Sequence, residues 1–202
     1  MRILAGRFKG RRLVTPKGDV TRPTADQVRL ALMDTLMPWL PQTRFLDLFA
    51  GAGVVGLEAL SRGAAHATFV ERDARAVAAL RANVDTLGVA AVTRVVRGDA
   101  VAELDRLARA GERFGVVFLD PPYEASAVDS TLRRLGAGDV TEPGALVIAQ
   151  HFTKRAPAAA VGALTAFRTR RFGATTLTFF RSGGYDAPSP SATADEAPDR
   201  ED

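Results

Sequence analysis

The chain has 202 residues, of which 47% are hydrophobic and 25% charged, and this composition fits one globular domain with a full core. It contains no cysteine and only two histidines, which excludes disulfides, thiolate nucleophiles and zinc–cysteine sites and argues against a multi-histidine metal site. No apolar run approaches the length that crosses a bilayer, and no signal-peptide pattern opens the chain, so we expect a cytoplasmic protein that binds neither a membrane nor a metal.

The net charge of +4 hides opposite charges at the two ends of the chain. Eight of the first 30 residues are basic and two are acidic. A basic arm over residues 1–22 that packs on the domain suggests a polyanionic partner such as nucleic acid, although a merely solvated basic face would look the same. Residues 182–202 are acidic and rich in Pro, Ser and Ala, which predicts a disordered tail.

Strand and helix patterns alternate through residues 23–181, which we take as the main domain. Thr24 and Gln27 form a capping box, and the apolar spacing after them predicts a helix over 25–37. Repeated β–α units predict an α/β fold with a doubly wound, mostly parallel sheet of seven strands. The strands are expected at 45–49, 68–71, 92–97, 116–119 and 145–149, followed by a hairpin of 164–169 and 175–180. Further helices are expected at 54–61, 74–87, 101–110 and 126–135.

A glycine motif follows the first predicted strand. Gly51, Gly53 and Gly56 fit the pattern G-x-G-x-x-G, in which the first glycine allows a tight turn, the second lets a ligand approach the backbone, and the third lets helix and strand pack closely. Glu71 ends the second predicted strand, twenty residues after Gly51. A carboxylate there meets the ribose hydroxyls of a nucleoside cofactor in this fold.

The cofactor class depends on the carboxylates around the glycines. A dinucleotide would place its pyrophosphate at the glycine turn, where the carboxylate of Asp47 would repel it. S-adenosylmethionine carries a cationic sulfonium instead, so Asp47, Glu71 and Asp99 at three successive strand ends favour it over NAD. Asp99 could accept the adenine amino hydrogens, cap the helix that follows, or do both.

The motif Asp120-Pro121-Pro122-Tyr123 follows a strand at Val116–Leu119. The carboxylate therefore lies at a carboxyl end of the sheet, where open α/β folds bind ligands. Proline has no backbone N–H, so the turn offers carbonyl acceptors, and Tyr123 offers a face for stacking. This combination suits a flat base with an amino group, whereas an isolated motif could equally be a proline turn with a core tyrosine.

Several further motifs carry a family resemblance. They are MRILAG at residues 1–6, KGRRL at 9–13, RPTADQVR at 22–29, LDLFAGAG at 46–53, GLEALSRGA at 56–64, and Phe172-Gly173 with Thr176-Leu177. With these residues the chain resembles the class I S-adenosylmethionine-dependent methyltransferases and, more closely, the RsmD family of bacterial 16S rRNA guanine-N2 methyltransferases. The resemblance covers residues 1–181. Leu30 and Gln150 depart from it, because the family usually has glutamates there.

The resemblance implies a site, a cofactor and a partner. It implies methyl transfer from S-adenosylmethionine to the N2 amine of a guanine in 16S rRNA, within an assembling small ribosomal subunit. Catalysis is expected from Asp120, Pro121, Pro122 and Tyr123. Cofactor contacts are expected from Thr24, Asp47, Phe49, Ala50, Gly51, Gly53, Glu71, Arg72, Asp99 and Ala100. RNA contacts are expected from Arg7, Lys9, Arg11, Arg12 and Arg22.

Three rival functions stay open at this point. A DNA or RNA adenine-N6 amino-methylase would use the same Asp120 motif, although a DNA enzyme would normally need a large target-recognition domain. An NAD-dependent oxidoreductase would explain the glycines and Glu71 but neither the Asp120 motif nor the basic arm. A non-catalytic RNA-binding module could also keep this fold.

Overall fold

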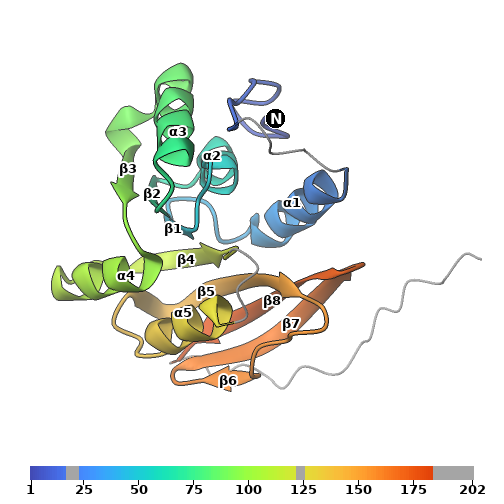
Figure 1. The fold of residues 1–202 in the computed structure, drawn as a ribbon, viewed down its shortest axis with the longest axis vertical. Helices are drawn as coiled ribbons and strands as arrows, with labels where there is room; N and C mark the ends of the chain where they lie inside the picture. Colours follow the sequence, from blue (N-terminus) through green and yellow to red (C-terminus); the bar gives the residue numbers. More distant parts are fainter. Residues whose placement is uncertain (17–22, 122–125, 184–202) are drawn as a thin grey trace, which may run out of the picture.

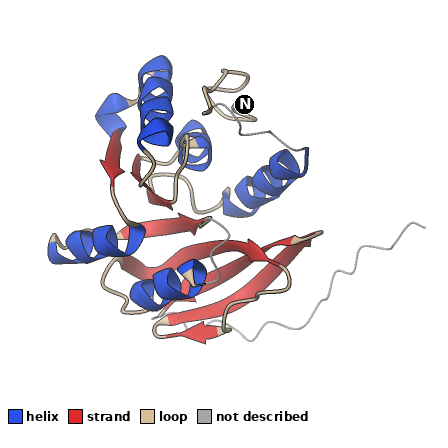
Figure 2. Cartoon of the chain, viewed as in Figure 1, coloured by secondary structure: helices blue, strands red, loops and turns tan. Residues whose placement is uncertain are grey.

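An eight-stranded sheet forms the centre of the computed structural model, which describes residues 1–16, 23–121 and 126–183 (Figure 1). The strand order is β3-β2-β1-β4-β5-β8-β7-β6. Helices flank the sheet on both faces (Figure 2), as the alternating pattern predicts. None of the helices in these ranges is both long and apolar enough to cross a membrane.

Five strands run parallel and three close the sheet in antiparallel order. The parallel set is β1 (Arg44–Leu48), β2 (His66–Glu71), β3 (Thr93–Arg97), β4 (Phe114–Leu119) and β5 (Thr141–Phe152). The antiparallel set is β6 (Ala160–Val161), β7 (Leu164–Phe172) and β8 (Thr175–Ser182). The predicted doubly wound, mostly parallel sheet is confirmed, with the two-residue β6 added to the seven expected strands and β5 longer than expected.

The helices lie close to their predicted positions. They are α1 (Pro23–Leu36), α2 (Val54–Ser61), α3 (Ala74–Leu87), α4 (Ala100–Arg109) and α5 (Ala127–Leu135), with a short 3₁₀ turn η1 (Ala90–Val92). α1 begins two residues earlier than predicted, at Pro23, because proline suits the first helical position. Thr24 therefore lies inside the first turn and not at the expected cap. The structure does not describe its side chain.

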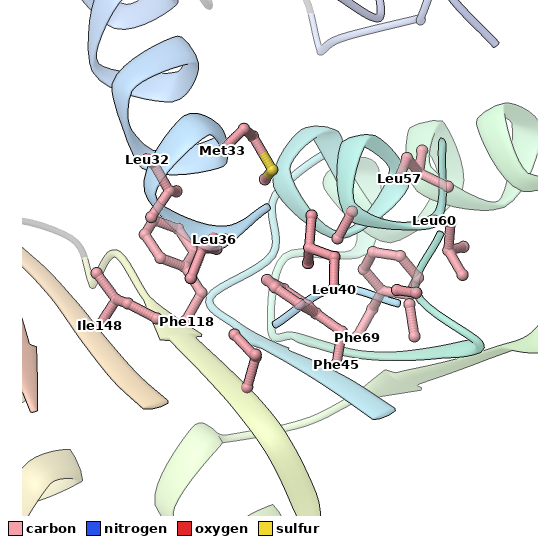
Figure 3. Close-up of a cluster of buried hydrophobic side chains, with 14 of the residues drawn as sticks. Leu32, Met33, Leu36, Leu40, Phe45, Leu57, Leu60, Phe69, Phe118 and Ile148 are labelled. Carbon is pink, nitrogen blue, oxygen red and sulfur yellow. The ribbon is translucent and has the colours of Figure 1, made fainter. Parts of the chain in front are cut away.

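Two hydrophobic cores lie on the two faces of the sheet. Phe45, Phe69 and Phe118 point toward α1 and α2 and pack there with Leu36 and Leu57 (Figure 3). The intervening strand residues, such as Leu46 and Leu119, join a second core with α4 and α5. Because side chains alternate along a strand, Asp47 and Asp120 follow Phe45 and Phe118 onto the α1 side. Both carboxylates thus face the same layer.

The N-terminal arm is tied to α2 through buried polar groups. The carboxylate of Glu58, which is fully buried, accepts hydrogen bonds from the backbone N–H groups of Leu4 and Ala5 at 2.8 and 2.9 Å. Ile3 and Leu13 are buried in the main core. The described part of the arm therefore packs on the domain. Residues 17–22, and the acidic tail from residue 184 onward, lie outside the described residues.

Candidate functional site

The parallel strands bring four polar side chains to one edge of the sheet. Leu48 of β1 is level with Val70 of β2 and Leu119 of β4, and Leu119 is level with Ala149 of β5. The residues that follow these four in the chain are Phe49, Glu71, Asp120 and Gln150, and they are therefore level with one another at the end of the sheet. Asp47 lies two positions before Phe49. This carboxyl edge is where open α/β sheets bind their ligands.

The turn after β1 has an unusual backbone. Phe49, Gly51 and Gly53 all have positive φ angles, of 63°, 54° and 78°. Such a conformation is uncommon for a residue other than glycine and concentrates at functional sites. Glu71 holds the turn from the neighbouring strand, because its Oε2 accepts from the Gly51 N–H at 2.7 Å. Its Oε1 accepts from the Asp73 N–H at 2.8 Å.

Two of the three motif glycines have close packing neighbours. A Cβ on Gly53 would lie 2.1 Å from Leu80 Cδ1, and one on Gly56 would lie 2.4 Å from Phe69 Cε1. Both glycines therefore allow close packing, as expected for Gly56, and the ligand approach expected at Gly53 stays a prediction. A Cβ on Gly51 would meet no atom within 4 Å. Gly51 is thus the motif glycine that faces open space.

Asp47 is a buried carboxylate beside this turn. It is 1% exposed, and its Oδ2 accepts from the Gly56 N–H at 2.9 Å. Burial raises its pKa to about 7, the hydrogen bond from Gly56 opposes this increase, and the charges of Asp120 and Glu71 add to it. None of the ion pairs formed within the described ranges involves these three carboxylates. The site is therefore suited to a cationic ligand.

Asp120 follows β4 and is held by β5. Gln150 Nε2 donates to its Oδ2 at 3.0 Å. Asp120 is an exposed residue, although many protein atoms surround its carboxylate. Desolvation raises the pKa of Asp120 to about 7, against the opposing effect of the Gln150 hydrogen bond. Gln150, noted in the sequence only as a departure from the family pattern, is thus a neutral donor to the predicted catalytic carboxylate.

Asp99 caps α4, which was one of the two roles considered for it. Its Oδ1 accepts from the N–H groups of Val101 and Ala102, both at 3.0 Å. The neighbouring Ala100 is buried. Ala50 is half-buried at the turn and Arg72 is exposed after Glu71. The adenine contact proposed for Asp99 stays a prediction.

Some predicted residues lie outside the described part of the chain. These are Arg22, Pro122, Tyr123 and the side chain of Thr24. Pro121 is described and is buried. Its roles, like those of the other predicted catalytic residues, stay predictions. Among the described residues, no group of three or more His, Asp or Glu side chains could hold a metal ion.

The tip of the predicted RNA-binding arm lies apart from this edge. Arg7, Lys9, Arg11 and Arg12 are all exposed. The Arg7 N–H donates to the carbonyl of Ser61 at 2.8 Å, and Ser61 is the last residue of α2, whereas the glycine turn begins that helix. Eight helical residues span roughly 12 Å. The tip of the arm is therefore attached at the end of α2 that is farther from Gly51.

Asn83 is a site residue that the sequence analysis missed. It is fully buried in α3, and its Nδ2 donates to the carbonyls of Val14 and Ala52 at 2.9 and 3.0 Å. Its Oδ1 accepts from the Val14 N–H at 2.7 Å. Asn83 thus joins the arm to the glycine turn. The available signal was a polar residue on the apolar face of a predicted helix, between Leu80 and Val84.

Comparisons with known proteins identify the family of this chain. A family model described as "Conserved hypothetical protein 95" matches residues 1–181. The Bacillus subtilis (strain 168) protein named "Putative rRNA methyltransferase YlbH" is 34% identical over 184 residues, which cover 91% of this chain and 100% of that protein. "Ribosomal RNA small subunit methyltransferase D" of Escherichia coli (strain K12) is 40% identical over 135 residues, or 67% of this chain and 66% of that protein.

A solved structure gives the same result for the fold. The protein described as "Putative methyltransferase yhhF from Escherichia coli" has a TM-score of 0.81 and 32% identity to this chain. The match covers 91% of this chain and 98% of that one. The edge that carries Asp47, Glu71 and Asp120 thus belongs to a methyltransferase fold. Together with the family match over residues 1–181, this means that the chain belongs to the RsmD family of methyltransferases.

Proposed function

We propose that this protein transfers a methyl group from S-adenosylmethionine to the exocyclic N2 amine of a guanine in 16S rRNA. The observation that carries the proposal is the position of Asp120, level with Glu71 and beside the open glycine turn. The names of the relatives support small-subunit rRNA as the substrate. We expect the protein to act on this rRNA within an assembling small ribosomal subunit.

The residues at the edge fit the cofactor. Each oxygen of Glu71 accepts one backbone N–H and keeps a lone pair for a ribose hydroxyl. Gly51 leaves space beside the turn, and Asp47 would repel a pyrophosphate but attract a cation. The same residues therefore disfavour NAD. When bound, S-adenosylmethionine supplies an electrophilic methyl group on a cationic sulfonium.

Asp120 and Pro121 would prepare the amine for attack. The lone pair of guanine N2 is delocalised into the ring, so the amine is a poor nucleophile. If Asp120 Oδ1 and the Pro121 carbonyl accept its two hydrogens, the nitrogen becomes pyramidal and its lone pair is free to point toward the methyl group. Gln150 fixes Asp120 Oδ2, which leaves Oδ1 for the substrate.

The same carboxylate would stabilise the transition state. Positive charge develops on N2 as the new bond forms, and an ionised Asp120 lies where it lowers the energy of that charge. Asp120 Oδ1 can then accept the proton that N2 releases. Much of the rate enhancement should come from positioning the two reactants. Tyr123, outside the described residues, is the side chain that we expect to stack on the target base once that base leaves its helix or loop.

The decisive experiment identifies the methylated atom. Labelled S-adenosylmethionine is incubated with the protein and unmethylated small-subunit particles, naked 16S rRNA or DNA, and the digested nucleosides are separated by mass spectrometry. We expect N2-methylguanosine from the small-subunit RNA. N6-methyladenosine would replace this proposal with an adenine amino-methylase. Absence of transfer to every substrate, with RNA still bound, would indicate a non-catalytic RNA-binding module.

A further inference from the structure

The C-terminal third of the domain carries a concentration of positive charge. Between Pro143 and Gly183 the chain has six Lys or Arg residues and no Asp or Glu. This segment comprises most of β5 and all of β6, β7 and β8. The overall net charge of +4 conceals it, because the residues between it and the N-terminal arm are acidic on balance.

Part of this charge follows directly after the strand that contacts Asp120. β5 continues past Gln150, which contacts Asp120, and ends at Phe152. Thr153, the next residue, attaches the turn after β5 to the β7–β8 hairpin. Its N–H donates to the Ala174 carbonyl at 2.8 Å, and its Oγ1 donates to the Gly173 carbonyl at 2.9 Å. In Figure 1, β4 points toward the side on which this hairpin tip lies.

Four side chains define what we call the edge surface: Phe152, Lys154, Arg155 and Arg171. The three basic residues are exposed, and Phe152 is 38% exposed. Arg171 Nε donates to the Gly173 carbonyl at 3.3 Å, which keeps this side chain at the hairpin tip. From Pro143 to Gly183, the part of the chain that supplies the surface, the sequence has no acidic residue.

Other arginines of the same segment have structural contacts instead. Arg170 Nη1 donates to the Ala31 carbonyl at 3.2 Å and to Thr35 Oγ1 at 3.3 Å, which attaches β7 to α1. Arg181 Nη1 donates to the Gly144 carbonyl at 3.0 Å. Arg168 is exposed as well but lies within β7, three residues before Arg171. Lys154, Arg155 and Arg171 are therefore the exposed charges at the turn after β5 and at the hairpin tip.

We propose that the edge surface binds the single-stranded RNA next to the target nucleotide, with phosphates on Lys154, Arg155 and Arg171 and a base on Phe152. Basic residues interleaved with an aromatic ring are the usual means of binding single-stranded nucleic acid. The assignment rests on the proposed function, because it needs an RNA substrate at Asp120. It places the RNA contacts nearest to Asp120 on the edge surface, and not on the tip of the arm, which is attached to the far end of α2.

The test measures methyl transfer as a function of salt. The edge variant carries Lys154→Gln, Arg155→Gln and Arg171→Gln, and the control variant carries Arg81→Gln, Arg109→Gln and Arg133→Gln on the exposed faces of α3, α4 and α5. Both lose three charges. Transfer to unmethylated small-subunit particles is followed from low to high KCl. The slope of log kcat/KM against log[KCl] should decrease in magnitude by about 2 in the edge variant.

The control variant should keep the original slope, and Phe152→Leu should lower kcat/KM by about 10-fold at constant salt. Calorimetry should show unchanged affinity of every variant for S-adenosylmethionine. If the protein is active but the edge variant has the slope of the control, or has lost cofactor affinity, this assignment is wrong and the proposed function stands. If the unmodified protein transfers no methyl group to small-subunit RNA, both are wrong.

Discussion

At the scale of single residues, the ionisation of Asp120 should control the rate. Its pKa is raised to about 7 by desolvation, and the carboxylate must be ionised to stabilise charge on the attacking amine. We expect kcat/KM to fall about tenfold per pH unit below pH 7 and to level off above it. Asp120→Asn should lose this pH dependence and about 100-fold or more in activity. Methyl-transfer rates across pH 5.5 to 9 provide the measurement.

Gln150→Glu tests whether the ionisation of Asp120 controls the rate. A second carboxylate 3.0 Å from Asp120 Oδ2, where Gln150 Nε2 now lies, would share a proton with it and raise the apparent pKa of the pair. The pH profile should shift upward, so that activity lost at pH 7 returns at pH 9. An unshifted profile would mean that another group controls the rate.

Asp47 should lower the stability of the protein at neutral pH. Its pKa is about 7 in the folded protein against 3.8 for an ordinary carboxyl group, so the folded state binds more protons between these values. The free energy of unfolding therefore decreases as pH rises from about 4 to 7. Asp47→Asn keeps an oxygen for the Gly56 N–H and removes the buried charge. It should stabilise the fold at pH 8 by on the order of 2 kcal/mol.

Chemical denaturation at pH 8 and pH 4 gives the comparison for Asp47→Asn. The gain should be present at pH 8 and become small near pH 4, where Asp47 is protonated in the folded state and close to half protonated in the unfolded state. Affinity for S-adenosylmethionine should decrease, because the variant no longer opposes the sulfonium with a negative charge. An equal gain at both pH values would show that packing, and not ionisation, explains the change.

At the scale of elements, the arm and the glycine turn are linked through one amide. Asn83 bonds both Val14 and Ala52, so Asn83→Leu leaves one buried and two partly buried backbone groups without this partner. We expect the variant to lose about 1–3 kcal/mol of stability and to bind S-adenosylmethionine more weakly, because Ala52 lies in the turn. Thr86→Val, which removes an exposed bond within α3, should change neither denaturation midpoint nor cofactor affinity.

The sequence was most informative where local chemistry decides the structure. The start of α3 at Ala74 and its end before Gly88 were predicted, because Asp73 supplies a cap and Gly88 adopts a left-handed turn. β5 was predicted too short, at 145–149, whereas it runs from Thr141 to Phe152. Pairing with β8 from Leu146 to Phe152 extends it past the apolar run, and pairing of Thr141 with Phe114 of β4, across an irregularity, extends it at its start.

For the site, too, the sequence predicted what depends on local pattern and missed what depends on contacts between distant residues. The carboxylates could be assigned to strand ends from the sequence alone, because a parallel sheet brings those ends to one edge. The contacts of Asn83 with Val14 and of Gln150 with Asp120 join residues 69 and 30 positions apart. Such contacts depend on which strands are neighbours, and a local pattern does not contain that information. The close packing of Gly53 likewise depends on the position of Leu80, a residue of another element.

At the scale of the whole molecule, positive charge occurs on two separate surfaces. The arm presents Arg7, Lys9 and Arg12, with Arg7 beside the end of α2, and the edge surface lies at the carboxyl edge of the sheet. An RNA that fills the site at Asp120 and also reaches the arm must extend over the α2 side of the domain. The two surfaces would then contribute independently to affinity, because distant charges act additively.

The arm should therefore supply affinity without affecting chemistry. Replacing Arg7, Lys9 and Arg12 with Gln should reduce the magnitude of the salt slope of RNA binding by about 2, raise KM and leave kcat unchanged. Arg11 is left in place because its Nη2 bonds the Thr86 carbonyl at 2.8 Å. Combined with the edge variant, the two reductions in slope should add. If the arm variant keeps the original slope, the charge of the arm is solvated and RNA approaches from the edge surface alone.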